Sequence, residues 1–359
     1  MGTGDSKIEL GQFYTKTNPF THPRVRKWLR EISHSELWLE PFAGAGNIVS
    51  MIDSTIGERN WTCYDIAPGA EYVEERDVLK SFPTGFDIVI TNPPYLAKNS
   101  ARRKGYGAAL EAMKPWDDLY MKCIDTCLSN VPHVAAIIPE SFIVSGALRE
   151  RLRFVVSLNQ DMFADTEHPV CLAVFGPRRT KDFTVWVGER RIGTWTEIGR
   201  LGSLPEVNGR YHFNDPRGRI GLQAVDNTVE ASIAFMPGRN IPASEIKHSS
   251  RHRTRIKVPE LQGTDTETLG RIIATANEKM DKWRRDTGDV LMSPFMGLRS
   301  DGVYRRRLDY ATASRLLQAA ILDVVGDGAG AKTRQRAVTD RARSRSRRTI
   351  EAMHKDRAT

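Results

Sequence analysis

Short apolar runs alternate with longer amphipathic stretches over the first half of the chain. Runs typical of strands occupy residues 36–41, 61–66, 74–79, 86–91, 133–139, 154–163 and 170–176. Helical spacing of apolar residues occupies 47–57 and 107–130. Strands that alternate with helices predict a doubly wound α/β fold with a mostly parallel sheet. The last two runs follow each other too closely for a crossover helix, so we expect an antiparallel strand at the edge of that sheet.

The pattern changes after residue 178. Residues 183–199 are typical of a β-hairpin, and residues 268–286 and 311–325 have helical spacing. We therefore predict a first domain over 1–178 and a second, mixed domain over 179–326. Residues 327–359 have few large apolar side chains and high charge, which predicts a flexible basic tail.

Charge and cysteine usage narrow the class of protein. The net charge is +9, but ten Lys/Arg and three Asp/Glu in residues 331–359 give the tail +7 of it. A polyanionic partner is therefore plausible without a strongly basic folded body. No apolar run is long enough for a membrane helix, and no signal peptide is evident, so we expect a cytoplasmic protein without membrane contact. The four cysteines lack metal-ligand spacing, so we expect reduced thiols and no metal site.

The run 86–91 ends in the sequence Asn-Pro-Pro-Tyr. Pro93 and Pro94 stop the strand because proline has no amide hydrogen to give to a sheet ladder. The turn therefore presents one amide side chain, Asn92, and one aromatic ring, Tyr95. In open α/β sheets, ligands bind at the carboxyl ends of strands, so we expect both side chains at a binding site.

Three acidic residues also follow predicted strands. Glu40 precedes a turn with Gly44 and Gly46 that is neither a dinucleotide fingerprint nor a phosphate loop. A carboxylate there suits a cation, Asp65 suits ribose hydroxyls, and Asp77 suits an adenine amino group. A ligand with a cation, a ribose and an adenine but no phosphate fits S-adenosylmethionine. Each aspartate has the alternative role of turn former or helix cap.

Three segments of the chain resemble gamma-type N6-adenine DNA methyltransferases in sequence and order. They are GQFYT at 11–15, EPFAGAGN at 40–47 and TNPPY at 91–95, and the resemblance covers roughly the first half. Lys16 replaces the proline that usually follows the first motif in the family. The Asn-Pro-Pro-Tyr turn also occurs in enzymes that methylate a glutamine amide in release factors, and related turns occur in RNA methyltransferases.

The resemblance implies a seven-stranded methyltransferase sheet, S-adenosylmethionine as cofactor and specific residue roles. Asn92 and the Pro93 carbonyl would accept hydrogen bonds from the target adenine amino group, within the catalytic turn Asn92, Pro93, Pro94 and Tyr95. Tyr95 and Phe163 would stack on the flipped base, although Tyr95 could instead be a core aromatic. The implied cofactor-binding set is Phe13, Tyr14, Thr15, Glu40, Pro41, Phe42, Ala43, Gly44, Asp65, Ile66, Asp77, Val78 and Asn92.

We expect the second domain, over 179–326, to recognise the DNA target, and basic residues supply candidate contacts to double-stranded DNA. We expect such contacts from Lys98, Arg102, Arg103, Arg251, Arg253, Arg299 and Arg305, and a solvated basic face is the alternative for each cluster. No nuclease motif is evident, so we expect a modification enzyme without built-in cleavage, and a separate cognate nuclease stays open. A monomer is slightly favoured. The alternatives are an RNA or protein glutamine-amide methyltransferase, or a non-catalytic DNA-binding protein on the same fold.

Overall fold

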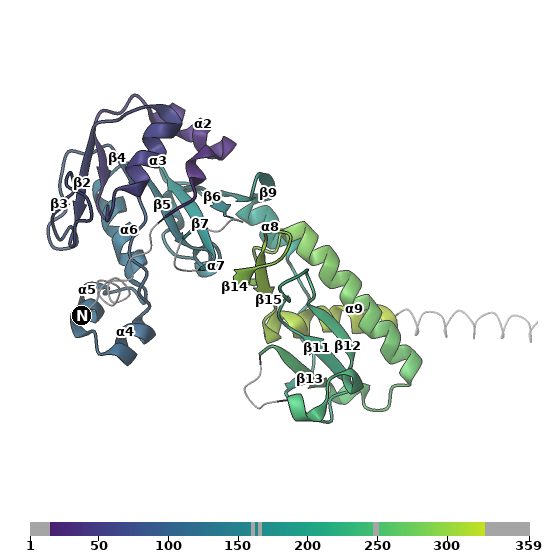
Figure 1. The fold of residues 1–359 in the computed structure, drawn as a ribbon. Helices are drawn as coiled ribbons and strands as arrows, with labels where there is room; N and C mark the ends of the chain where they lie inside the picture. Colours follow the sequence, from purple (N-terminus) through teal and green to yellow (C-terminus); the bar gives the residue numbers. More distant parts are fainter. Residues whose placement is uncertain (1–14, 159–161, 164–166, 247–250, 327–359) are drawn as a thin grey trace, which may run out of the picture. The chain divides into compact units, whose positions relative to one another are not determined.

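The computed structural model describes residues 15–158, 162–163, 167–246 and 251–326, and Figure 1 traces the chain. Phe13 and Tyr14 of the predicted cofactor set lie outside the described residues, as does the predicted tail over 327–359. No helix in the described ranges is long and apolar enough to cross a membrane.

A nine-stranded sheet in the order β3-β2-β1-β4-β5-β7-β6-β8-β9 forms the centre of the first compact unit. Strands β1 to β5 run parallel, and β7 is antiparallel to both of its neighbours. The strands are β1 (Trp38–Glu40), β2 (Trp61–Asp65), β3 (Glu74–Glu75), β4 (Ile88–Thr91), β5 (His133–Pro139), β6 (Leu152–Ser157), β7 (Val170–Phe175), β8 (Thr184–Val187) and β9 (Arg190–Thr194).

The mostly parallel α/β fold predicted from the sequence is confirmed, with two differences. The antiparallel strand β7 lies inside the sheet rather than at its edge. The predicted hairpin over 183–199 is present as β8 and β9, but β8 pairs with β6 and extends the sheet beyond seven strands. The predicted domain boundary at residue 178 therefore falls within this sheet.

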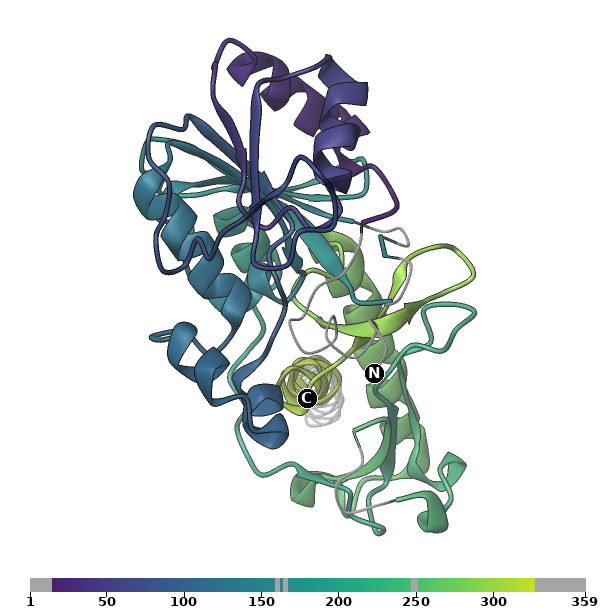
Figure 2. The ribbon, with the colours of Figure 1, turned by 60° about the vertical axis from the view of Figure 1, so that its left-hand side comes forward.

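Helices cover both faces of the sheet, with α2 and α3 on one side and α6 on the other (Figure 2). The strands between them are buried along their whole length, as in β4 and β7, because both faces are covered. The helices of this part of the chain are α2 (Pro23–Ile32), α3 (Asn47–Ile56), α4 (Lys98–Lys104), α5 (Gly107–Ala112), α6 (Leu119–Asn130), α7 (Phe142–Ser145) and α8 (Trp195–Leu201), with 3₁₀ turns at Pro19–Thr21 and Arg149–Arg151.

The segment after the Asn-Pro-Pro-Tyr turn is more helical than the sequence predicted. The basic loop expected there contains α4, which ends at Gly105 in a left-handed conformation (φ 75°). The single helical region expected over 107–130 is divided into α5 and α6. The break contains Pro115, which has no amide hydrogen for a helical bond.

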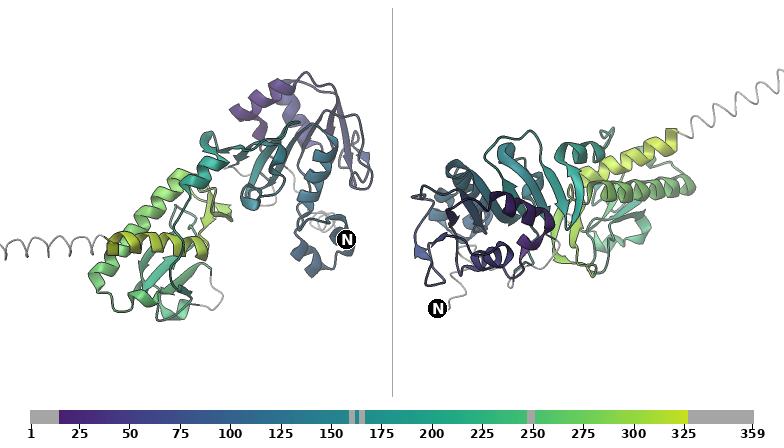
Figure 3. Two further views of the ribbon diagram at one scale, coloured as in Figure 1. Left: turned by 180° about the vertical axis from the view of Figure 1, so that it is seen from behind. Right: turned by 90° about the horizontal axis from the view of Figure 1, so that it is seen from above.

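The second compact unit contains a four-stranded antiparallel sheet in the order β10-β13-β11-β12. Its strands are β10 (His212–Phe213), β11 (Ile220–Gln223), β12 (Ala234–Pro237) and β13 (Arg253–Lys257), with 3₁₀ turns at Gly238–Asn240, Ala243–Glu245 and Pro259–Leu261. The two helices predicted from the sequence are confirmed as α9 (Thr266–Thr287) and a helix over 310–326. They lie side by side, joined by an ion pair between Lys279 and Asp323 (Figure 3).

The chain passes between the two units several times. The first unit comprises the described residues up to Ser203 together with Val225–Ser232 and Arg284–Arg307. The second comprises Leu204–Ala224, Ile233–Trp283 and the described residues from Leu308 onward. The returning segment Arg284–Arg307 includes a separate hairpin, β14 (Ser293–Leu298) and β15 (Tyr304–Arg307). Part of the region that the sequence assigned to a second domain thus belongs to the first unit.

Candidate active site

The strand order reverses between β1 and β4, and the polar residues predicted from the sequence lie at the carboxyl ends of these two strands. β1 pairs with β2 on one side and with β4 on the other. Glu40 ends β1, and Asn92 directly follows β4. This is the switch point at which open α/β sheets bind ligands.

Glu40 is fully buried and only partly satisfied. The Thr91 hydroxyl donates a 2.6 Å hydrogen bond to Glu40 Oε1, whereas Oε2 has no hydrogen-bond partner in the described part of the chain. Burial raises the pKa of the Glu40 carboxyl to about 8, and the Thr91 hydroxyl offsets part of that rise. A buried acceptor without a partner is costly unless something satisfies it, so this carboxyl suits a cationic ligand group.

Asp65 holds the glycine turn together. Its Oδ2 accepts a 2.8 Å hydrogen bond from the Gly44 amide, and its Oδ1 accepts one of the same length from the Ala67 amide. Gly69 lies so close to the turn that a Cβ there would be 2.9 Å from the Gly44 carbonyl oxygen. The backbone of the glycine turn is therefore tightly packed, and Asp65 lines the cavity together with Gly44.

Asp77 forms a local turn, which is the alternative role that the sequence left open for it. Its Oδ1 accepts hydrogen bonds from the amides of Leu79 and Lys80, and Oδ2 pairs with the exposed Lys80 ammonium. It still faces the same cavity as the glycine turn.

A cavity of about 880 Å³ joins these residues. That volume lies within the range of sites that enclose a small-molecule ligand. From the predicted cofactor set, the lining contains Thr15, Pro41, Phe42, Ala43, Gly44, Asp65, Ile66, Asp77, Val78 and Asn92. Glu40 lies behind this wall rather than on it. The lining combines polar side chains, among them Asp65, Asp77 and Asn92, with the apolar Ile66 and Val78, and so fits a ligand with both polar and apolar parts.

The sequence did not predict that α5 and the residues before it would line this cavity. Tyr106, Gly107, Ala108, Ala109, Glu111 and Ala112 all contribute, as does Leu119 at the start of α6. Their place in the segment that follows the Asn-Pro-Pro-Tyr turn was the only signal, because none of these residue types suggests ligand binding by itself.

The Asn-Pro-Pro-Tyr turn is fixed by hydrogen bonds on both sides of Asn92. The Tyr95 hydroxyl lies 2.7 Å from Asn92 Oδ1 and 2.7 Å from the Ile137 carbonyl oxygen. Asn92 Nδ2 donates to Thr15 Oγ1 at 3.3 Å, and Asn47 Nδ2 donates to the Thr15 carbonyl. Thr15 thus contacts the turn, as the order of the motifs implied, and the Asn92 amide is held in one orientation.

Tyr95 and Phe163 lie together but do not form a slot for a base. Their ring centroids are 6.1 Å apart with an interplanar angle of 75°, which is an edge-to-face contact. Both rings are buried. In this conformation Tyr95 is a core aromatic, so a base can enter between the two rings only if one of them turns.

The basic residues predicted to contact DNA differ in their surroundings. Arg102 and Arg103 are exposed on α4, and Lys98 of the same helix pairs with Asp117. Arg251 is exposed, and Arg253 pairs with Glu245.

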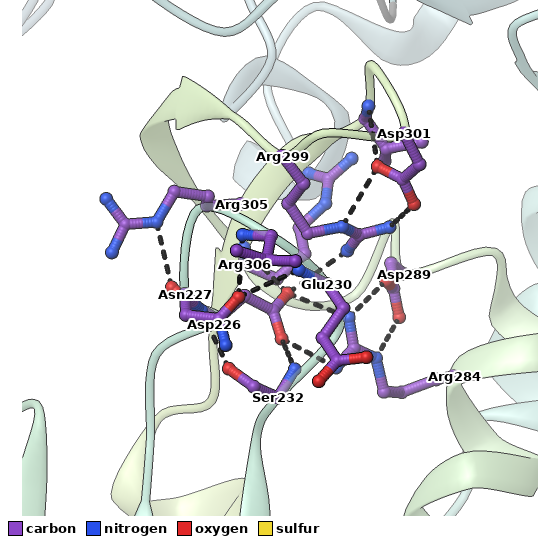
Figure 4. A network of polar contacts seen from close by, with 12 residues as sticks. Asp226, Asn227, Glu230, Ser232, Arg284, Asp289, Arg299, Asp301, Arg305 and Arg306 are labelled. Atoms are coloured by element: carbon purple, nitrogen blue, oxygen red, sulfur yellow. Dashed lines mark hydrogen bonds and ion pairs between the residues drawn. The ribbon is translucent and has the colours of Figure 1, made fainter.

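Arg299 is a correction to the sequence prediction. It is 8% exposed, and its guanidinium pairs with the buried Asp226 and with Asp301. It therefore leaves the set of DNA-contacting candidates. Arg305 donates from Nε to the Asp226 carbonyl and lies over the Phe295 ring, while its terminal nitrogens point away from the buried cluster (Figure 4).

Comparison with protein families gives one match. Residues 27–161 match the model of the Eco57I restriction-modification methylase family, over less than half of the chain. This segment contains the glycine turn, Asp65 and the Asn-Pro-Pro-Tyr turn, and the expectation of S-adenosylmethionine as cofactor agrees with the match. No curated protein matches the chain significantly.

Solved structures resemble the chain only distantly. One is the type I restriction-modification methyltransferase subunit from Streptococcus thermophilus, at 14% identity and a TM-score of 0.38, covering 50% of this chain and 48% of that one. Another is a class I S-adenosylmethionine-dependent methyltransferase from Listeria monocytogenes, at 12% identity, 52% and 70% coverage and a TM-score of 0.35. A third is the type I restriction enzyme EcoKI M protein, at 13% identity, 84% and 69% coverage and a TM-score of 0.33. The chain thus spans about half the length of the first of these relatives.

Proposed function

We propose that this protein is an S-adenosylmethionine-dependent DNA methyltransferase of the restriction-modification type, and that it methylates adenine at N6. The observation that supports this best is the shared cavity at the strand switch point. Its wall joins the glycine turn and Asp65 to Asn92 of the catalytic turn. A methyl donor held by the first group and an amino group held by Asn92 would meet there.

The cofactor would supply an electrophilic methyl group, and the chain would hold it by three kinds of contact. Glu40 lies behind the cavity wall, so a local movement of that wall would let it ionise and take the ammonium group on its unpartnered Oε2. Asp65, at the end of β2, would accept hydrogen bonds from ribose hydroxyls. Ile66, 49% exposed although apolar, would pack with Val78 against the adenine ring.

The target amino group would be activated by hydrogen-bond acceptors rather than by a strong base. Its lone pair is delocalised into the adenine ring, so it is a poor nucleophile. Asn92 Oδ1 and the Pro93 carbonyl would accept its two hydrogens and favour a tetrahedral nitrogen. A carbonyl oxygen has two lone pairs, so Oδ1 can accept from the Tyr95 hydroxyl and from the substrate together. The proton released after methyl transfer would pass to solvent.

A base in a duplex cannot reach this cavity, so the proposal requires base flipping. Tyr95 and Phe163 would stack on the extruded base after their edge-to-face contact opens. Phosphate contacts would come from the basic side chains that stay outside the buried cluster, namely Lys98, Arg102, Arg103, Arg251, Arg253 and Arg305. A separate cognate nuclease as partner belongs to the same proposal.

The test is methyl transfer by the purified protein from labelled S-adenosylmethionine to unmethylated duplex DNA, followed by nucleoside analysis. We expect N6-methyladenine at a fixed sequence. Asn92→Ala should lower transfer by at least about 100-fold, as expected when a transition-state acceptor is removed. It should still bind the cofactor with wild-type affinity by calorimetry, because Asn92 acts on the target nitrogen.

The same assay separates the alternatives. Label in RNA or in a release-factor glutamine, with none in DNA, would replace the proposed substrate. Label in DNA cytosine would retain DNA methylation and remove the adenine assignment. Binding of cofactor and DNA without any transfer would leave a non-catalytic DNA-binding protein, and wild-type rates in Asn92→Ala would remove the mechanism.

A further inference from the structure

A buried ion pair links the β14–β15 hairpin to the catalytic edge of the sheet. Arg306 Nη1 donates to Glu140 Oε2 at 2.8 Å, and Nη2 donates to Oε1 at 3.0 Å. The Ser157 hydroxyl adds a 2.6 Å hydrogen bond to Glu140 Oε1. Arg306 is 1% exposed and Glu140 3% exposed, so this two-bond pair is shielded from solvent and fixed in one geometry. Neither residue lines the cavity described above.

One end of the pair lies next to the target-base side of the site. Glu140 directly follows β5, the strand whose Ile137 carbonyl contacts the Tyr95 hydroxyl. The Glu140 amide donates to the Pro169 carbonyl at 2.9 Å, just before β7 begins. Glu140 therefore ties β5 to the segment that follows Phe163 in the chain.

The hairpin contacts that same segment at two more points. The Tyr304 hydroxyl donates to the His168 carbonyl at 3.4 Å, and Tyr304 is 1% exposed. On the other strand of the hairpin, the Glu167 carboxylate lies beside Gly297, since a Cβ there would be 3.2 Å from Glu167 Oε2. The hairpin and its ion-pair partner thus hold the carbonyls of two successive residues, His168 and Pro169.

The other end of the pair belongs to a second charged cluster, centred on Asp226. The Arg306 amide donates to Asp226 Oδ2 at 3.1 Å, and Arg284 donates to both Asp226 oxygens at 3.0 and 2.9 Å. Arg284 also pairs with Asp289 (Figure 4). Asp226 is fully buried, so the hairpin is attached at its base by several charged hydrogen bonds.

These residues stand where the chain crosses between the two compact units. Asp226 lies in the second position of the returning segment Val225–Ser232. Arg284 begins the segment Arg284–Arg307, and Arg306 is its penultimate residue. The pair thus connects the catalytic edge to the points at which the chain leaves for the second unit.

We propose that Arg306, through Glu140, is a positioning residue for methyl transfer: it holds the end of β5 and residues 168–169 so that Tyr95 and Phe163 can receive the target base. The inference rests on the proposed function. It assigns Arg306 to the step in which the base is accommodated, rather than to cofactor binding or to phosphate contact.

The test compares two conservative substitutions in the full-length protein. Arg306→Lys keeps the charge but loses the two-bond geometry. Arg151→Lys is the matched control, because Arg151 also donates several hydrogen bonds, among them to the Val131 and Gly176 carbonyls. Arg151 lies just before β6, at the end of that strand opposite to Ser157, which contacts Glu140. Where Arg306→Lys does not fold, the double variant Glu140→Gln/Arg306→Met removes both charges together and takes its place.

For Arg306→Lys we expect unchanged cofactor affinity by calorimetry, an unchanged KM for DNA, and a kcat lowered at least about tenfold, as small misplacements of reacting groups produce. The rate should recover largely when the target adenine is placed in a mismatch, because a mismatched base flips at lower cost. Arg151→Lys should keep its kcat on paired DNA.

Equal kcat losses in both variants, or a loss that the mismatch does not relieve, would overturn the positioning role. A wild-type protein that binds cofactor but methylates no DNA would instead be a failure of the proposed function.

Discussion

At the residue scale, the most informative side chain is Glu40. Its position at the end of β1 could be predicted from the sequence, but its protonation could not, because that depends on burial. With the pKa raised to about 8, the carboxyl is mostly neutral at pH 7 in the ligand-free protein. A cationic ligand group would reverse this balance, since a nearby positive charge favours the ionised form.

Cofactor binding should therefore release close to one proton at pH 7. Affinity should rise with pH between about 6 and 7.5, by up to about tenfold per unit, as Glu40 ionises more readily. Above that range an α-amino group of ordinary pKa loses its own proton, and the gain ends. Calorimetry in buffers of different ionisation enthalpy measures the proton, and Glu40→Gln should abolish both the release and the rise. If the affinity of the wild-type protein did not change with pH, Glu40 would not bind the cationic group of the cofactor.

The same pKa shift affects the stability of the ligand-free protein. A carboxyl whose folded pKa is raised contributes stability below its unfolded pKa, near 4.5, and loses it as pH rises through about 8. Glu40→Gln should accordingly raise the melting temperature at pH 9 more than at pH 5. An equal change at both pH values would mean that Glu40 does not titrate in this range.

At the element scale, the strand-end motifs could be predicted and their partners could not. Apolar runs and prolines locate the ends of β1, β2 and β4, so the strand-end positions of Asp65 and Asn92 could be predicted from the sequence alone. Arg299 belonged to a basic cluster in the sequence. Its carboxylate partner Asp226 is 73 residues away along the chain, and only the folded structure brings them together. The hairpin β8–β9 was predicted for the same local reasons, but a hairpin pattern does not state which sheet it joins.

The glycine turn permits a sharp test at this scale. In Gly69→Ala the new Cβ would meet the Gly44 backbone at 2.9 Å, which no side-chain rotation can relieve. The turn should widen and cofactor affinity should fall at least about tenfold, as when binding groups are displaced. Gly57→Ala is the control. Gly57 has φ 87° and ψ 163° at the end of α3, a conformation almost exclusive to glycine, with open space around it, so alanine should cost ~1–3 kcal/mol of stability and leave affinity unchanged. Equal affinities in both variants would show that the turn does not shape the site.

At the scale of the whole molecule, the first compact unit depends on residues distant in sequence. A chain that ends at Ser203 contains every strand of the nine-stranded sheet but lacks the hairpin and Arg306, so Glu140 would lose its ion-pair partner. If Glu140 stays buried, the unpaired charge costs up to ~3–5 kcal/mol. We expect the truncated chain to melt far below the full-length protein in a thermal scan, and Glu140→Gln in the truncated chain to recover part of the loss. A truncated chain as stable as the full-length first unit would show that the hairpin is dispensable.

The repeated crossing of the chain also limits how the second unit could be exchanged between related proteins. The second unit consists of Leu204–Ala224, Ile233–Trp283 and residues from Leu308 onward, with Val225–Ser232 and Arg284–Arg307 returning between them. A single crossover, whether by recombination in nature or in a designed chimera, would exchange the two returning segments along with the rest. The incoming hairpin would then have to carry a residue that pairs with Glu140. A compatible partner for the exchange is therefore a protein that has counterparts of both Glu140 and Arg306.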